Sequence, residues 1–244
     1  MKNVLITGGA GGIGSEISKV FLEKGYFVLI VDTDAAAGEA LVKQYGADKC
    51  RMVQLDVTDN AALEQFAASL GEAFALNHII TLAGRALEDE WIPFARQGMD
   101  MIERSVKVNL LGHIGAVHAF LPCLQRGDGD KSVLMIATIN AMTNFGLPGY
   151  SAAKAGLTGF VNAMVGEFGK DGIRINTISP GTVVTEATLT EPKDWDALRK
   201  TTAINRFAPA EEVAKMAYGI CEEFTSVTGQ NFVIDAGQTK MHSV

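Results

Sequence analysis

The chain has 244 residues, of which 48% are hydrophobic, which is enough for one large α/β domain with a sizeable core. Its formal net charge of −7, without a run of Lys or Arg, argues against a nucleic-acid partner. The longest wholly apolar stretch, at 27–31, is too short to span a membrane and no signal-peptide pattern is present, so we expect a cytoplasmic protein without a membrane partner. His113 and His118 would face different sides of a helix and the three cysteines are widely spaced, so no metal site is predicted.

Short β-rich runs alternate with longer helical runs along almost the whole chain. Strands are expected at 3–7, 26–32, 50–56, 78–82, 132–138, 174–179 and 231–235. Helices are expected between the first two strands and at 35–45, 60–70, 99–124, 150–170 and 210–224. This alternation predicts a single α/β domain, residues 1–244, with a doubly wound parallel seven-stranded sheet covered by helices on both faces. The segment 182–206 interrupts the alternation and is expected to be a substrate loop.

A glycine-rich loop joins the first expected strand to the helix after it. Its sequence is "TGGAGGIG", from Thr7 to Gly14. Residues without Cβ let the backbone turn tightly and approach a diphosphate, while the helix start offers unpaired N–H groups and a positive dipole end. A tight turn without a ligand is the alternative, but the strand before and the helix after favour a dinucleotide. The predicted contacts are Gly8, Gly12, Ile13 and Gly14.

An acidic residue, Asp32, ends the second expected strand. A carboxylate at this place can accept a hydrogen bond from the adenosine ribose and repels a 2′-phosphate. Neither the glycine loop nor "DTD" at 32–34 offers an Arg or Lys to attract that phosphate, so the sequence favours NAD over NADP. The competing role of Asp32 is to cap the next helix.

Tyr150 and Lys154 lie one helical turn apart in "YSAAKAG", so both project from the same face of a helix. A phenol with a pKa near 10 suits proton transfer at neutral pH only if its phenolate is stabilised by roughly 4 kcal/mol. A Lys cation and an oxidised nicotinamide ring in a partly dry cleft can supply that stabilisation. An exposed, unrelated pair is the alternative for this common pattern.

The glycine spacing TGxxxGxG and the segment "YSAAK" are similar to the signatures of the short-chain dehydrogenase/reductase family, and the resemblance covers almost the whole chain. It implies a Rossmann-like fold, with Tyr150 as acid/base and Lys154 lowering the pKa of that Tyr and binding the nicotinamide ribose. It also implies that Asn109, in "VNLLG", holds a water in a proton relay to Lys154. The closing segment 226–237 is similar to the strand that often takes part in family tetramers, so a homo-oligomer, tetramer or dimer, is expected.

The resemblance also implies further contacts with the cofactor. Asp56 would meet the adenine amino group and Val57 would lie beside the ring, although capping of the helix near Asn60 competes for Asp56 and suits Asp59 better. Ala83 and Gly84 would face the ribose. The remaining contacts come from the segment "SPGTVVT", which in the family meets the nicotinamide carboxamide: Pro180, Gly181, Val183 and Thr185.

Two positions depart from the family pattern. The usual N-N-A-G is "TLAG" at 81–84, where Leu82 replaces an Asn that normally braces the sheet, and a structural consequence is expected. The usual substrate-binding Ser is replaced by Thr138, one residue nearer to the Tyr. Thr138 keeps a hydroxyl that can orient the substrate oxygen, with Asn140, Thr143 or no donor as alternatives.

These features together predict an NAD-dependent oxidoreductase that interconverts a secondary alcohol and a ketone, with a small molecule as its partner. A nucleotide-binding regulatory protein without turnover is the rival, and a sugar-nucleotide epimerase or dehydratase is a third option. The expected substrate-lining residues mix aromatic, polar and positive groups and fit a steroid, a sugar alcohol or a hydroxy acid equally well. They are Arg85, Trp91, Asn144, Phe145, Leu189 and Trp195.

Overall fold

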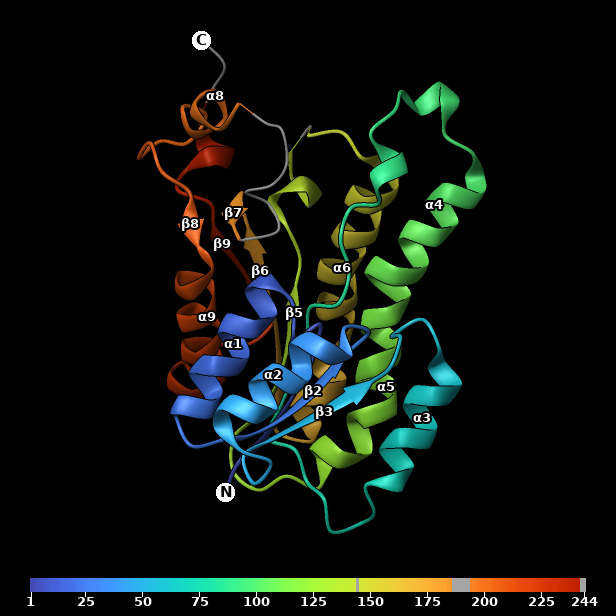
Figure 1. Ribbon diagram of the computed structural model, residues 1–244, viewed down its shortest axis with the longest axis vertical. Helices are drawn as coiled ribbons and strands as arrows, with labels where there is room; N and C mark the ends of the chain where they lie inside the picture. Colours follow the sequence, from blue (N-terminus) through green and yellow to red (C-terminus); the bar gives the residue numbers. More distant parts are fainter. Residues whose placement is uncertain (144, 186–193, 242–244) are drawn as a thin grey trace.

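The computed structural model describes residues 1–143, 145–185 and 194–241 and has the predicted α/β architecture (Figure 1). A seven-stranded parallel sheet runs through the described residues in the order β3-β2-β1-β4-β5-β6-β9. Its strands are β1 (Asn3–Thr7), β2 (Phe27–Asp32), β3 (Cys50–Gln54), β4 (His78–Thr81), β5 (Lys131–Ile136), β6 (Ile173–Pro180) and β9 (Asn231–Ile234). The strand order reverses between β1 and β4, and in such sheets ligands bind outside the carboxyl ends at the reversal.

Helices cover both faces of this sheet, as predicted. One layer consists of α1 (Gly12–Glu23), α2 (Ala35–Tyr45) and α9 (Ala210–Tyr218), and the other of α3 (Asn60–Ser69), α5 (Gly112–Gln125) and α6 (Pro148–Lys170). Alternate residues of one strand enter opposite cores: Val28 and Ile30 pack with the first layer, and Leu29 and Val31 with the second. All four are fully buried, which explains why this strand is apolar throughout.

The helix expected at 99–124 is present as one unbroken helical stretch, but a wide turn within it separates two α-helices. α4 (Met99–Val106) passes into a π-helical turn, Lys107–Leu111, before α5 begins. A second π turn, Gly219–Glu223, follows α9. Both turns keep the chain helical, so hydrophobic spacing does not reveal them, and π turns occur frequently at functional sites.

The helix caps decide two alternatives that the sequence left open. Asp34, rather than Asp32, caps α2 by accepting a hydrogen bond from Ala37 N at 3.0 Å. Asp59, rather than Asp56, caps α3 through Ala62 N at 3.0 Å. Asp32, the last residue of β2, and Asp56, two residues after β3, therefore do not serve as helix caps.

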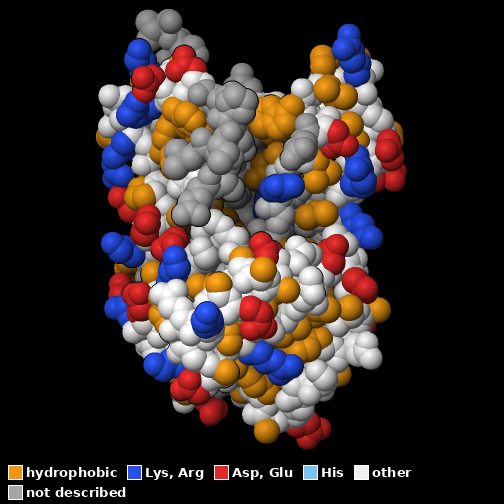
Figure 2. Space-filling model, viewed as in Figure 1, with side chains coloured by type: hydrophobic (Ala, Val, Ile, Leu, Met, Phe, Trp, Pro, Cys, Tyr) orange, Lys and Arg blue, Asp and Glu red, His pale blue; other side chains and the backbone are white. Residues whose placement is uncertain are grey.

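The segment 182–206 contains more structure than a loop. β7 (Val183–Val184) pairs with β8 (Ala208–Pro209) in a small second sheet, and α8 (Trp195–Arg199) follows Asp194. The space-filling view is hollowed between the α8 side and the start of α4, with apolar side chains along both walls (Figure 2). Asn144 and Leu189 of the expected substrate lining lie outside the described residues. None of the described helices combines the length and hydropathy needed to cross a bilayer.

Candidate active site

Thr138 and Tyr150 meet beyond the carboxyl end of β5. Thr138 follows the strand and begins a short 3-10 turn, Ile139–Ala141, while Tyr150 lies in the first turn of α6. Burial raises the pKa of the Tyr150 phenol to about 12, and the negative charge of Glu90 acts in the same direction. A hydrogen bond from Thr138 lowers the pKa but does not offset burial. The structure therefore brings the expected hydroxyl donor onto the expected acid/base.

The alternative donors are placed differently. The backbone N–H of Asn140 donates to Thr138 Oγ1 at 3.3 Å, and the Thr138 hydroxyl lies 3.4 Å from Asn140 Oδ1. Thr143 donates to the carbonyl oxygen of Ile139 at 2.9 Å. Thr138 is thus the hydroxyl in contact with Tyr150, and Asn140 lies behind it.

Lys154 lies one turn further along α6, with its ammonium group buried. Nζ donates to the carbonyl oxygen of Ile136 at 2.9 Å and lies 3.1 Å from Nε2 of His113. Burial lowers the pKa of Lys154 to about 7. With its pKa near neutral pH, the protonation of Lys154 can respond to a charged group that binds beside it.

His113 is a site residue that the sequence did not predict. It is 1% exposed on α5, and its Nδ1 lies 2.8 Å from the Thr81 hydroxyl at the end of β4. Burial, together with the positive charge of Lys154, holds the pKa of His113 well below its ordinary value. The sequence could have indicated His113 as a site residue, because it follows Asn109 by four residues and so lies on the same side of the helix.

Asn109 lies in the first π turn and is fully buried. Its Nδ2 donates to the carbonyl oxygens of Arg85 at 3.0 Å and Ser105 at 3.1 Å. Its Oδ1 faces Gly84, where a Cβ would lie 2.5 Å from that oxygen and φ is +133°. Among the described contacts its side chain does not reach Lys154, so the water relay through Asn109 stays a prediction.

The glycine loop forms a cradle whose spacing requires glycine. At Gly8, where φ is +70°, a Cβ would lie 2.7 Å from Ala83 N, and at Gly14 it would overlap the carbonyl oxygen of Gly8. At Gly12 a Cβ would lie 2.7 Å from Thr185 Cγ2, which places Thr185 across the loop. The N-cap of α1 is Gly11 and has no side-chain hydrogen bond, so the N–H groups at the helix start remain available to an anion.

Asp32 borders this cradle, and Asp56 lies just after the neighbouring strand β3. Asp32 accepts hydrogen bonds from Ala10 N at 3.0 Å and Asp34 N at 3.1 Å, which ties the end of β2 to the glycine loop. Asp56 accepts from Thr58 N at 2.8 Å. A diphosphate on the helix start would therefore have a carboxylate close to its adenosine side.

The other expected cofactor contacts lie at the carboxyl ends of their strands. Val57 is buried against the start of α5, where a Cβ at Gly112 would lie 2.7 Å from it. Pro180 ends β6, and Gly181 donates to the carbonyl oxygen of Ile234 at 3.0 Å. Three further residues are Ile13 near the first core, buried Val183 in β7, and Ala83, whose N lies 3.5 Å from Thr7 Oγ1.

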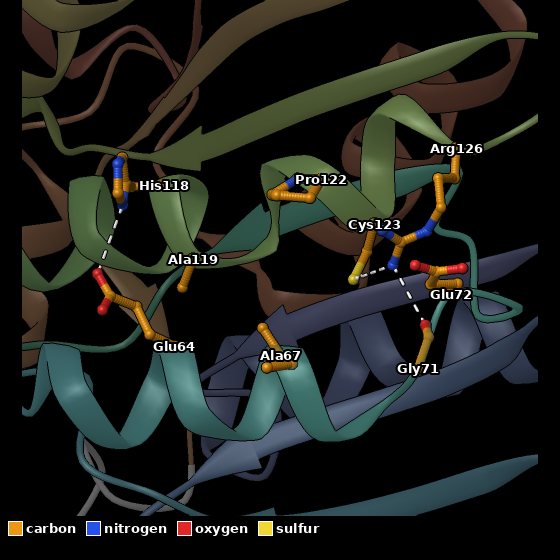
Figure 3. A pocket seen from close by; sticks show the side chains of 10 residues that line it. Glu64, Ala67, Gly71, Glu72, His118, Ala119, Pro122, Cys123 and Arg126 are labelled. Carbon is orange, nitrogen blue, oxygen red and sulfur yellow. Dashed lines mark hydrogen bonds and ion pairs between the residues drawn. The ribbon is translucent and has the colours of Figure 1, made fainter.

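A hollow of about 410 Å³ lies between α3 and α5, away from these residues (Figure 3). Small side chains such as Ala67 and Ala119 form its floor, and Glu64, His118 and Arg126 stand at its rim. It contains none of the expected site residues. The site is therefore defined by chemistry at the strand ends and not by this hollow.

The comparisons with known proteins agree with this geometry. A model of the short chain dehydrogenase family matches residues 2–195. The chain belongs to the short-chain dehydrogenase/reductase family. The D-threitol dehydrogenase of Mycolicibacterium smegmatis is 30% identical to it over 98% of this chain and 93% of that protein.

A further relative and a solved structure also match this chain over nearly its whole length. The probable galactose dehydrogenase of Rhizobium meliloti is 29% identical over 97% of this chain and 94% of that protein. A crystal structure of a short-chain dehydrogenase/reductase from Burkholderia thailandensis has a TM-score of 0.88 and 29% identity, and it covers 99% of this chain and 94% of that one. The family consists of oxidoreductases, and this supports an enzyme that acts on CH–OH groups.

The departure at "TLAG" has a structural explanation. Leu82 packs against the first core, so no polar brace forms at its position. The brace comes instead from the neighbouring residue, Thr81, through His113. His113 also contacts Lys154, so in this family member the sheet brace is continuous with one of the expected catalytic residues.

Proposed function

We propose that this protein is an NAD-dependent dehydrogenase that interconverts a secondary alcohol and a ketone, with Tyr150 as acid/base. The contact between Thr138 and Tyr150, beside buried Lys154, is the observation that carries the proposal. The names of the threitol and galactose dehydrogenases support an alcohol as substrate. We also propose one domain over residues 1–244 with 182–206 as its substrate segment; the cytoplasmic location and homo-oligomer stay predictions.

The residues present fit a dinucleotide. Gly8, Gly12 and Gly14 leave the space that a Cβ would fill, and the uncapped start of α1 offers N–H donors for a diphosphate. Asp32 would accept a hydrogen bond from the adenosine ribose and repel a 2′-phosphate, which is why NAD is proposed over NADP. When bound, NAD supplies the hydride acceptor for alcohol oxidation.

The side chains around the reacting oxygen divide the proton chemistry. With substrate bound, the Thr138 hydroxyl turns from Tyr150 to donate to the substrate oxygen and orient it, and Tyr150, as phenolate, takes the alcohol proton. With a pKa of about 12 in the structure, this phenol requires added positive charge to ionise near neutral pH. Protonated Lys154 supplies part of that charge, with His113 Nε2 as its neighbour at 3.1 Å, and a water held by Asn109 would complete the proton relay.

The test combines cofactor binding with turnover. Purified protein with NAD and a panel of secondary alcohols is expected to produce reduced nicotinamide absorbance, and Tyr150→Phe to lose at least about 1,000-fold in kcat while binding NAD with unchanged affinity. Tyr45→Phe is the matched control, because Tyr45 lies at the end of α2 and contacts Glu23. Activity that survives in Tyr150→Phe would exclude this mechanism, and NAD binding without turnover of any alcohol would favour a regulatory protein.

A further inference from the structure

Glu90 carries a buried carboxyl group that has no partner in the described part of the chain. The residue is 2% exposed, and neither carboxyl oxygen has a hydrogen-bond partner among the described residues. Arg104, a nearby cation on α4, forms its ion pair with the neighbouring Asp89 instead. A buried carboxyl group whose oxygens make no hydrogen bond is destabilising, so its presence indicates that its partners arrive with a ligand.

The backbone holds Glu90 in place at the end of a short 3-10 turn, Glu88–Glu90. Its N–H donates to the carbonyl oxygen of Leu87 at 3.1 Å, and Gln97 Nε2 donates to its carbonyl oxygen at 2.9 Å. The same Gln97 amide donates to the carbonyl oxygen of Ile92 at 3.0 Å, so one side chain holds the last residue of the turn and the segment just after it. The inward position of the carboxylate is thus fixed by its backbone.

In the loop around Glu90, aromatic side chains are exposed and the acidic side chain is buried, which is the reverse of what a surface loop normally shows. Trp91 and Phe94 are 61% and 66% exposed, while the acidic side chain between α4 and the strand end is buried. Burying a carboxyl group while two aromatic side chains stay exposed is unfavourable, because the hydrophobic effect favours the reverse arrangement. A folded segment with this pattern indicates a binding function for the buried acid.

Glu90 lies on the side of the sheet where α6 carries Tyr150: its neighbour Asp89 pairs with Arg104 of α4, and α4 packs against the first turn of α6, where a Cβ on Gly149 would lie 3.2 Å from Ser105 Cβ. The charge of Glu90 acts on Tyr150, whose pKa it raises, and on Arg104 across the loop. A substrate with its reacting oxygen at Tyr150 and Thr138 would therefore place the adjoining carbons near Glu90. Two carboxylate oxygens can accept from two neighbouring hydroxyl groups.

We propose that Glu90 binds hydroxyl groups next to the reacting carbon, and that the substrate is a polyhydroxylated molecule, a sugar or sugar alcohol. This inference rests on the proposed function and narrows its substrate class. A hydroxy acid would bring a second negative charge to the carboxylate, and a steroid would bring no donors beside the reacting carbon. Of the three classes compatible with the sequence, the polyol alone supplies what Glu90 lacks.

The first experiment compares alcohols that share the reacting group: butan-2-ol, butane-2,3-diol and 3-hydroxybutyrate, each with NAD. Wild type is expected to favour the diol over butan-2-ol by about 10- to 100-fold in kcat/KM, and Glu90→Gln to lose most of this preference. Glu103→Gln makes the same chemical change at an exposed position on α4 and should keep the preference. The proposal is overturned if the ratio of kcat/KM for the diol over butan-2-ol is unchanged in Glu90→Gln. It is also overturned if wild type prefers butan-2-ol or 3-hydroxybutyrate to the diol.

The second experiment separates this proposal from the proposed function. Calorimetric titration of butane-2,3-diol into Tyr150→Phe with NAD measures binding without turnover, and adding Glu90→Gln is expected to weaken it by about tenfold or more. If wild type oxidises none of the alcohols, the proposed function fails while this titration still decides the role of Glu90. Glu90→Gln should also raise the Tm of the ligand-free protein, because it removes an unpaired buried charge. A lower Tm with unchanged diol binding would make Glu90 a structural residue and overturn the proposal.

Discussion

Nζ of Lys154 lies 3.1 Å from Nε2 of His113, and both side chains are buried. Because burial keeps the pKa of His113 well below its ordinary value, its ring is neutral at pH 7. Nε2 then accepts from the Lys154 ammonium, and Nδ1–H faces Thr81 Oγ1 at 2.8 Å. The end of β4 is thereby connected through one ring to the lysine that serves Tyr150.

His113→Leu should change the pH dependence of alcohol oxidation. Loss of the acceptor destabilises the ammonium of Lys154 and lowers its pKa further below about 7. The phenolate of Tyr150 then loses positive charge beside it, so its pKa rises and the acidic limb of the kcat profile moves to higher pH by about one unit. Profiles of kcat against pH measure this. His118→Leu, on the same helix with its side chain 78% exposed, should not move the limb, and an unmoved limb in His113→Leu would make the contact purely structural.

Substitutions of Thr138 separate its hydroxyl from its shape. Thr138→Ser keeps the hydroxyl that contacts Tyr150 and should retain kcat/KM within about threefold. Thr138→Val keeps the branched shape, removes the donor and should lose about 10- to 100-fold in kcat/KM. Steady-state kinetics on the best alcohol measures both, and equal activity in the two variants would transfer the role to Asn140 or to no residue.

Asp32→Asn should weaken discrimination between the two dinucleotides. The single amide oxygen can keep the hydrogen bond from Ala10 N that ties β2 to the glycine loop, while the bond from Asp34 N to the other carboxylate oxygen is lost. Without the negative charge, the ratio of kcat/KM for NAD over NADP should fall by about 10- to 100-fold. Asp34→Asn, which changes the cap of α2, is the control and should keep the ratio. A ratio that is unchanged in Asp32→Asn would remove the basis for NAD preference.

The acid stability of the protein should depend on Glu222, at the amino-end side of the sheet. Although burial opposes it, hydrogen bonds from His78 and Lys2 hold the pKa of Glu222 at about 2, below its ordinary value of 4.5. A depressed folded pKa adds stability above pH 4.5, and this stability is lost as the pH falls towards 2. Burial also lowers the pKa of His78, whose protonation in the unfolded chain adds to the loss below pH 6.5.

Glu222→Gln should therefore lower the free energy of unfolding at pH 7 by about 2 kcal/mol and flatten its dependence on pH between 5 and 2. Urea unfolding at a series of pH values measures both effects. Glu223→Gln, the neighbouring carboxylate, should leave the slope unchanged. An equally steep slope in Glu222→Gln would show that other carboxylates govern acid unfolding.

The order of helices and strands follows from the sequence, because it is written in local patterns. "FVLIV" is apolar at every position since both faces of β2 are buried, and Gly25, with φ +83°, stands just after α1 where a left-handed residue is needed. The proximity of Tyr150 and Lys154 is equally local, because α6 alone fixes it. The π turn at Asn109 escapes such patterns, since a single widened turn leaves the hydrophobic spacing almost unchanged.

Contacts between elements were decided only by the tertiary structure. His113 and Lys154 are 41 residues apart and meet because the packing of α5 and α6 on the sheet brings their buried faces together. The burial of Glu90 depends on how its loop packs beside α4, where Asp89 pairs with Arg104, and its sequence, flanked by acidic and aromatic residues, resembles an ordinary surface segment. Sequence fixes the chemistry that each local segment offers. Burial and long-range packing decide which of those groups come into contact, and the low dielectric constant around them sets their pKa values.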